Sequence, residues 1–180
     1  MENVKNNAAK WVLDPTHSEL TFKVKHLMIS NVKGEFKNFT AEIDHEDFKN
    51  ATVKVSIETS SIFTNNTDRD NHLKSADFFD VENHQAMTFE STDFKKVDDD
   101  EYKLKGLLTI KGVSKEVLLD VEFGGTNKDP WGNIKAGFSF SGKINRKDWG
   151  LNWNAALETG GVLVSDEVKI AGEVQFVKQA

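Results

Sequence analysis

The segment Leu20-Thr21-Phe22-Lys23-Val24-Lys25-His26 alternates apolar and polar side chains with a period of two. This alternation is typical of a β-strand that buries one face. The same pattern recurs at residues 11–13, 34–44, 53–58, 86–94, 101–111, 117–123, 134–144 and 168–176. The sequence therefore predicts about eight long strands, with a short additional strand at 11–13.

Turns and one helix are expected between these strands. The turn signals are 98–101, 111–115 and 127–132, and both prolines lie at strand boundaries. The segment from Asn65 to Phe79 breaks the alternation and predicts a short helix, with Thr67 or Asp68 as its N-cap.

The expected organisation is one all-β domain. The chain has 180 residues, of which 1–10 are expected to be a flexible N-terminal segment and 11–180 the domain. Consecutive strands with polar turns indicate a sandwich or a barrel, and alternation alone does not choose between them. An eight-stranded barrel is either filled by side chains or holds one ligand.

The composition restricts the kinds of partner. A net charge of −6 disfavours nucleic acid, and the absence of cysteine excludes disulfides and thiolate chemistry. Phe occurs 13 times against one Tyr, which indicates an interior of wholly apolar rings. No stretch is long and apolar enough to predict stable membrane insertion. Residues 1–7 contain no apolar core of a signal peptide, so the sequence predicts a cytoplasmic protein, or a periplasmic or secreted one if a leader had been removed.

Several segments together resemble the YceI-like domain family. They occur in the family's order and are 11–22, 24–26, 34–36, 60–64, 69–81, 88–91, 106–115, 144–151 and 164–168. The segment 69–81, Arg-Asp-Asn-His-Leu-Lys-Ser-Ala-Asp-Phe-Phe-Asp-Val, is the most distinctive. The resemblance implies an eight-stranded antiparallel, lipocalin-like β-barrel with one short helical insertion. It also implies a hydrophobic cavity that holds a polyisoprenoid or another long-chain amphiphilic lipid.

The inward phase of the strands gives a candidate cavity wall. Its members are Phe22, Val24, Phe36, Ile57, Phe89, Leu108, Ile110, Phe138, Phe140 and Ile170. The alternative is that these side chains pack on one another, and for any single Phe this is the better interpretation. The resemblance favours a cavity for the set as a whole.

The helical insertion offers Arg69, His72, Leu73, Phe78 and Phe79 to close one barrel mouth or line the tunnel. Arg69 could pair with a phosphate or another polar head group, or with a neighbouring acid such as Asp68 or Asp70.

Three further side chains have two interpretations each. His26 is in phase with the inward residues. It is expected to be either a hydrogen-bonded core histidine or a ligand contact. Trp149 and Trp153 are expected either to plug one barrel end or to contact a ligand tail.

Catalytic and metal-binding patterns have little support. His17 and Ser18 are neighbours at a strand start, so their side chains are expected on opposite faces, which disfavours a hydrolase that uses them with Asp14. The five histidines lack zinc-ligand spacing. We therefore expect no catalytic residue, no metal and no cofactor.

Three functions remain open. The first is a barrel that binds a long-chain lipid for storage, transport or sensing. The second is an enzyme that acts on an amphiphile in the same cavity, and the third is an interaction domain with a solid core. A homodimer is left open as well.

Overall fold

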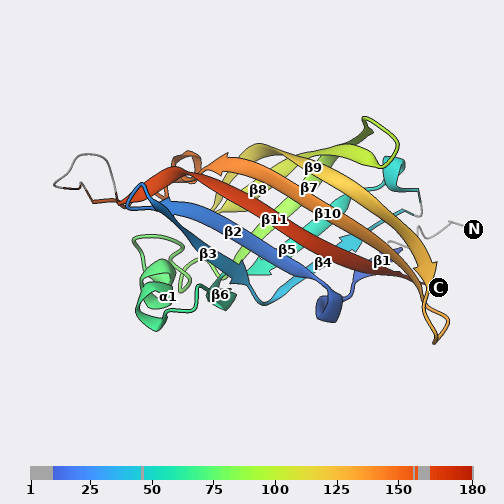
Figure 1. The fold of residues 1–180 in the computed structure, drawn as a ribbon, viewed down its shortest axis with the longest axis horizontal. Helices are drawn as coiled ribbons and strands as arrows, with labels where there is room; N and C mark the ends of the chain where they lie inside the picture. The colour runs from blue at the N-terminus through green and yellow to red at the C-terminus, as the bar shows by residue number, and fades with distance from the viewer. Residues whose placement is uncertain (1–9, 46, 156, 158–162, 180) are drawn as a thin grey trace, which may run out of the picture.

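The structure is a computed structural model that describes residues 10–45, 47–155, 157 and 163–179 (Figure 1). Within these ranges the chain forms eleven strands and one α-helix. The strands are β1 (Trp11–Leu13), β2 (Glu19–His26), β3 (Ser30–Phe36), β4 (Phe39–Ile43), β5 (Val53–Glu58), β6 (Ile62–Phe63), β7 (Ala86–Lys96), β8 (Glu101–Ile110), β9 (Val113–Lys128), β10 (Ile134–Asn145) and β11 (Val164–Lys178). The helix is α1 (Thr67–Lys74), and the predicted turns at 98–101, 111–115 and 127–132 join or end strands.

Eight of the strands close into an antiparallel barrel in the order β1-β4-β5-β7-β8-β9-β10-β11, with β11 pairing back to β1. The long strand β11 makes this closure possible, because its C-terminal end pairs with β1 while Val164–Glu173 pairs with β2. Strands β2, β3 and β6 then extend the sheet on the side of α1 (Figure 1). The predicted eight-stranded barrel with one helical insertion is confirmed.

The period-two pattern places side chains as expected. In β9, Val117, Leu119 and Val121 are buried, while the intervening Leu118 and Asp120 are exposed. Apolar side chains from facing strands therefore meet inside the barrel, and the charged side chains remain in water.

The prediction of one strand over 34–44 is wrong. The chain forms β3 and β4 with a break at Lys37 and Asn38, because β3 pairs with β2 whereas β4 pairs with β1 and β5. At the break, Lys37 N donates to Ser61 O at 3.1 Å and Asn38 Nδ2 to Glu58 Oε2 at 2.8 Å. These bonds hold the chain where it changes neighbours.

The helix lies inside the predicted segment, but the prediction of Thr67 or Asp68 as its N-cap is wrong. Asn66 is the cap, and its side-chain oxygen accepts a hydrogen bond from Arg69 N at 3.0 Å. Asn65, just before it, has a φ of 60°, a conformation that Asn tolerates better than most residues. The chain thus turns into α1 one residue earlier than expected.

Three inward phenylalanine rings lie against glycines of the adjacent strand. The pairs are Phe22 with Gly34, Phe89 with Gly106 and Phe140 with Gly172. A methyl group added to any of these glycines would collide with the ring of its partner. Each ring therefore packs flat over the backbone of the barrel wall instead of extending across the interior.

Candidate functional site

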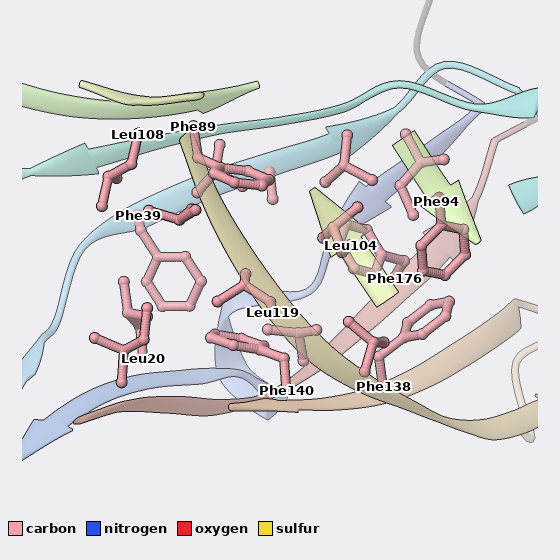
Figure 2. Close-up of a pocket in the computed structure, with 18 of the residues that line it drawn as sticks. Leu20, Phe39, Phe89, Phe94, Leu104, Leu108, Leu119, Phe138, Phe140 and Phe176 are labelled. Atoms are coloured by element: carbon pink, nitrogen blue, oxygen red, sulfur yellow. The ribbon is translucent and has the colours of Figure 1, made fainter. Parts of the chain in front are cut away.

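The barrel interior contains an entirely apolar cavity at the end away from α1, which we call the deep cavity (Figure 2). Its volume is about 140 Å³, and every side chain that lines it is a hydrocarbon. Figure 2 shows Phe39, Leu104, Leu119 and Phe176 pointing into this space from several strands. A buried water needs two to four polar partners, so such a cavity excludes water and suits an apolar ligand.

A second cavity of about 470 Å³ opens at the α1 end of the barrel, and we call it the mouth cavity. Helix α1 and the turn that follows it cover one side, and β2 and β11 form the other. Its wall is mainly apolar but includes the ionisable side chains of Lys25, His26, Asp68, Arg69, His72 and Arg146. Polar groups are thus gathered at one end of an otherwise apolar interior.

The two cavities adjoin. Leu20, Ile57, Leu108 and Ile170 line both, and we call these four shared residues the constriction. An elongated apolar ligand that entered at α1 would pass them to reach the deep cavity.

Nearly all of the predicted site residues line one or both of these cavities. The mouth cavity receives Phe22, Val24, His26, Phe36, Arg69, Leu73, Phe78, Phe79, Ile110 and Trp153; the deep cavity receives Phe89, Phe138 and Phe140; and Ile57, Leu108 and Ile170 line both. Trp149 lines neither, because it is buried in the protein and its Nε1 donates to Leu108 O at 2.8 Å. Its indole ring is a packing element.

Arg69 is held by Thr64 rather than by an acid. Its Nε donates to Thr64 Oγ1 at 2.8 Å and its Nη2 to Thr64 O at 2.6 Å. Asp70 accepts from Thr64 N at 2.8 Å and does not pair with Arg69, so neither expected ion pair forms among the described residues. Among the described residues Arg69 thus has no direct carboxylate partner, and Thr64 Oγ1 links it to Asp70.

The two histidines of the mouth differ in their surroundings. His72 Nε2 lies 2.9 Å from Asp77 Oδ2. The His72 ring packs edge-on against Trp153 and Phe78, with ring centroids 4.6 and 5.2 Å apart. The side chain of His26 has no hydrogen-bond partner within the described ranges. His72 is therefore fixed by its neighbours, whereas His26 has a free ring on the cavity wall.

Arg146 organises the mouth and was not among the predicted site residues. It is only 3 % exposed and donates to the carbonyls of Leu151, Trp153 and Ser165 at 2.6, 2.8 and 3.0 Å. Burial lowers the pKa of Arg146, and Asp166 at 3.9 Å partly offsets this effect. The guanidinium joins the segment after β10 to the start of β11, next to the cavity. The sequence feature that could have drawn attention to Arg146 is its position in the Arg-Lys-Asp-Trp-Gly turn at residues 146–150.

The residues considered for a hydrolase form a strand cap instead. Hydrogen bonds from Lys135 at 2.8 Å and from Thr16 hold the pKa of Asp14 well below its usual range. His17 Nδ1 lies 2.9 Å from the same carboxylate, and Ser18 Oγ donates to Asp14 O at 2.7 Å. In the described part of the chain His17 and Ser18 make no mutual hydrogen bond, so they do not form a nucleophile and base pair.

The described residues contain neither a metal-ion cluster nor a membrane-spanning helix. No three His, Cys, Asp or Glu side chains there come together as a metal ion would require. Among those residues, too, no helix has the length and apolar character needed to cross a membrane.

Comparison with known proteins gives matches over nearly the whole chain. The family description "YceI-like domain" matches residues 11–176. A UPF0312 protein of Staphylococcus epidermidis is 44 % identical over 170 residues, covering 93 % of this chain and 96 % of the relative. The crystal structure of a YCEI protein from Campylobacter jejuni is 39 % identical, covers 88 % of this chain and 91 % of the other, and has a TM-score of 0.74.

A more distant structure has the same fold. It is described as a polyisoprenoid binding domain from Saccharophagus degradans and is 15 % identical to this chain. The match covers 96 % of this chain and all of the other, with a TM-score of 0.69.

Proposed function

The chain belongs to the YceI-like domain family, and we propose that its barrel binds one long-chain amphiphilic lipid, of the polyisoprenoid class, without catalysing a reaction. One observation carries the proposal. The interior is a mouth cavity with polar groups that adjoins a deep cavity lined only by hydrocarbon side chains. This gradient matches a ligand with one polar end and a long apolar tail.

The polar end of the ligand lies at α1 in this proposal. Among the described residues, Arg69 has no direct carboxylate partner and the His26 ring has no hydrogen-bond partner, and both side chains line the mouth cavity. Both can orient a phosphate or hydroxyl head group. The tail then passes Leu20 and Ile57 in the constriction and ends in the deep cavity.

Burial of the tail supplies the affinity. Each buried CH₂ contributes about 0.8 kcal/mol, so a five-carbon isoprene unit contributes roughly 4 kcal/mol before entropy losses. Affinity therefore rises with chain length until the deep cavity is filled. The polyisoprenoid described for the Saccharophagus degradans domain, which has the same fold, is consistent with this class of ligand.

An enzyme that acts on the amphiphile is the second candidate, because His72 and Asp77 form a histidine–carboxylate pair at the mouth. General acid–base catalysis needs the base within hydrogen-bond reach of a reacting atom. His72 Nε2 lies 2.9 Å from Asp77 Oδ2, which leaves Nδ1 as the candidate base, and among the described residues Nδ1 has no hydrogen bond to a hydroxyl or a second acid. The side chain of Asp77 is also 54 % exposed to solvent. The pair therefore faces the rim of the mouth, which favours binding over catalysis.

Native mass spectrometry of protein purified without detergent tests the proposal. We expect one long-chain adduct per chain, and organic extraction then identifies the lipid class. Recovery of the same lipid, chemically unchanged, after prolonged incubation separates binding from catalysis. A polypeptide that remains bare after incubation with polyprenyl lipids would refute the binding role.

A further inference from the structure

Among the described residues, the turn between β2 and β3 is the most apolar exposed feature at the mouth end of the barrel. Ile29 is 85 % exposed, Met28 52 % and Leu27 41 %. The turn lies at the same end as α1 and opposite the chain termini (Figure 1). His26, which lines the mouth cavity, immediately precedes it. We call Leu27, Met28 and Ile29 the apolar tip.

The backbone of the apolar tip is strained. Leu27 and Met28 have φ values of 55° and 62°, and Ile29 N donates to His26 O at 3.3 Å. This is a tight hairpin turn with positive φ at both central residues, where Asn-Gly is the favoured pair. Bulky apolar residues at such positions are costly. Neither the turn geometry nor the barrel core accounts for these three side chains.

The hairpin that carries the apolar tip is basic, although the whole chain is acidic. Residues 20–34 contain Lys23, Lys25 and Lys33 and no Asp or Glu, and the two acids of the hairpin, Glu19 and Glu35, lie toward the strand ends away from the apolar tip. Nearby acids on β11 already have cations, since Asp166 lies 3.4 Å from Lys147 Nζ and Glu167 lies 3.9 Å from Lys143 Nζ. The hairpin therefore presents excess positive charge.

The positive charge continues along the outer face of the barrel. A groove starts at the base of the hairpin, and its charged side chains are Lys23, Lys33, Lys143, Lys169, Glu35 and Asp120. Asp120 is paired with Lys103, and Lys143 lies 3.9 Å from Glu167, so Lys23, Lys33 and Lys169 are the groove cations that form no salt bridge with a described residue. A row of lysines, Lys169, Lys23 and Lys33, thus crosses the outer face of β11, β2 and β3 behind the apolar tip.

From these observations we propose that the β2–β3 hairpin docks on the surface of an anionic lipid bilayer. The apolar tip inserts among the acyl chains at the interface, and the lysines contact anionic head groups. Docking there brings the mouth cavity to the bilayer, so that a lipid can enter the barrel without crossing water. The membrane contact goes beyond the proposed function, because it needs no ligand in the cavity.

The test is flotation of the full chain with phosphatidylcholine vesicles, with and without phosphatidylglycerol. The variant L27N/M28G/I29S removes the apolar tip and supplies the preferred Asn-Gly turn, so it is expected to fold at least as stably as the wild type. We expect its binding to anionic vesicles to fall about tenfold or more, and the binding of K23Q/K25Q/K33Q to fall similarly. Vesicles without phosphatidylglycerol should bind the wild type weakly.

Trp131→Ser is the matched control, because Trp131 is 84 % exposed but lies in the β9–β10 turn at the opposite end of the barrel. It should float like the wild type. Wild-type protein that does not float, or equal flotation of the apolar-tip variant, would overturn the inference. So would a loss caused by Trp131→Ser. A dimer that disappears in the apolar-tip variant, without any flotation, would assign the tip to self-association instead.

Ligand retention separates this inference from the proposed function. The apolar-tip variant should retain its lipid in native mass spectrometry but take up lipid from vesicles more slowly. Docking without any adduct would refute the lipid-binding role alone, and an adduct without docking would refute the membrane contact alone.

Discussion

Replacing Ala41 with Leu should shorten the longest chain that the barrel can hold. Ala41 is buried on β4 and lines the deep cavity but not the mouth cavity. Leu adds three carbon atoms to a space of about 140 Å³. A tail that occupies this space then buries about three fewer carbon atoms. Its binding free energy is weaker by roughly 2.4 kcal/mol, which corresponds to an affinity about 50-fold lower. A ligand whose tail ends at the constriction gives up nothing.

The assay is a comparison of dissociation constants for polyprenyl alcohols of increasing length. The affinities of the wild type and Ala41→Leu should agree for short chains and diverge once the tail passes Ile57 and Leu108. Ala171→Leu is the control, because Ala171 is exposed on the outer face of β11. An equal effect on short and long chains, or no effect on the longest, would refute the two-cavity arrangement.

Three further predictions concern the mouth, the strand cap and the cavity wall. Arg146→Met should lower the free energy of unfolding by about 3 kcal/mol or more in urea titration, since buried carbonyls lose their donor, and should release the ligand. Asp14→Asn should lower the free energy of unfolding by about 1–3 kcal/mol at pH 7. The pKa of Asp14 is depressed in the folded state, so its stabilisation is present above about pH 4 and lost as the pH falls further. The wild type and this variant should converge in acid unfolding, and a constant difference from pH 7 to pH 2 would contradict the assignment. Phe138→Arg places an unpaired charge in the deep cavity and should abolish lipid retention, whereas Ser139→Arg, which is exposed on the same strand, should not. Unchanged uptake by Phe138→Arg, at an unchanged circular dichroism spectrum, would mean that this wall is wrong.

Which side chains of a strand point into the barrel was predictable, because this depends on local sequence. In β10, Phe138 and Phe140 alternate with Ser139 and Ser141, and the structure turns the two phenylalanines toward the deep cavity. Period two decides which face a residue occupies, but it does not decide the depth of that residue along the barrel axis. The constriction at Leu20 and its division of the interior into two cavities were therefore not predictable.

Long-range contacts account for the other differences. Arg146 is charged and lies in a turn, features that indicate exposure, yet it is buried because carbonyls from two distant segments converge on it. The break at Lys37 and Asn38 has the same kind of origin, since it depends on which strands become neighbours of β3 and β4. Trp149 packs under β8 for a similar reason, through its bond to Leu108 O.

The phenylalanines that pack on Gly34, Gly106 and Gly172 have a consequence for how ligand choice can change. Each glycine acts as a recess that receives an aromatic ring and so sets the bore of the channel. At Gly34 the added methyl group would meet only the ring of Phe22, so alanine there would push this ring away and change the width of the mouth cavity. At Gly106 and Gly172 it would also meet a backbone oxygen, so the strand itself would have to shift. Related barrels could therefore acquire a preference for thinner or thicker chains through a position that never contacts the chain itself.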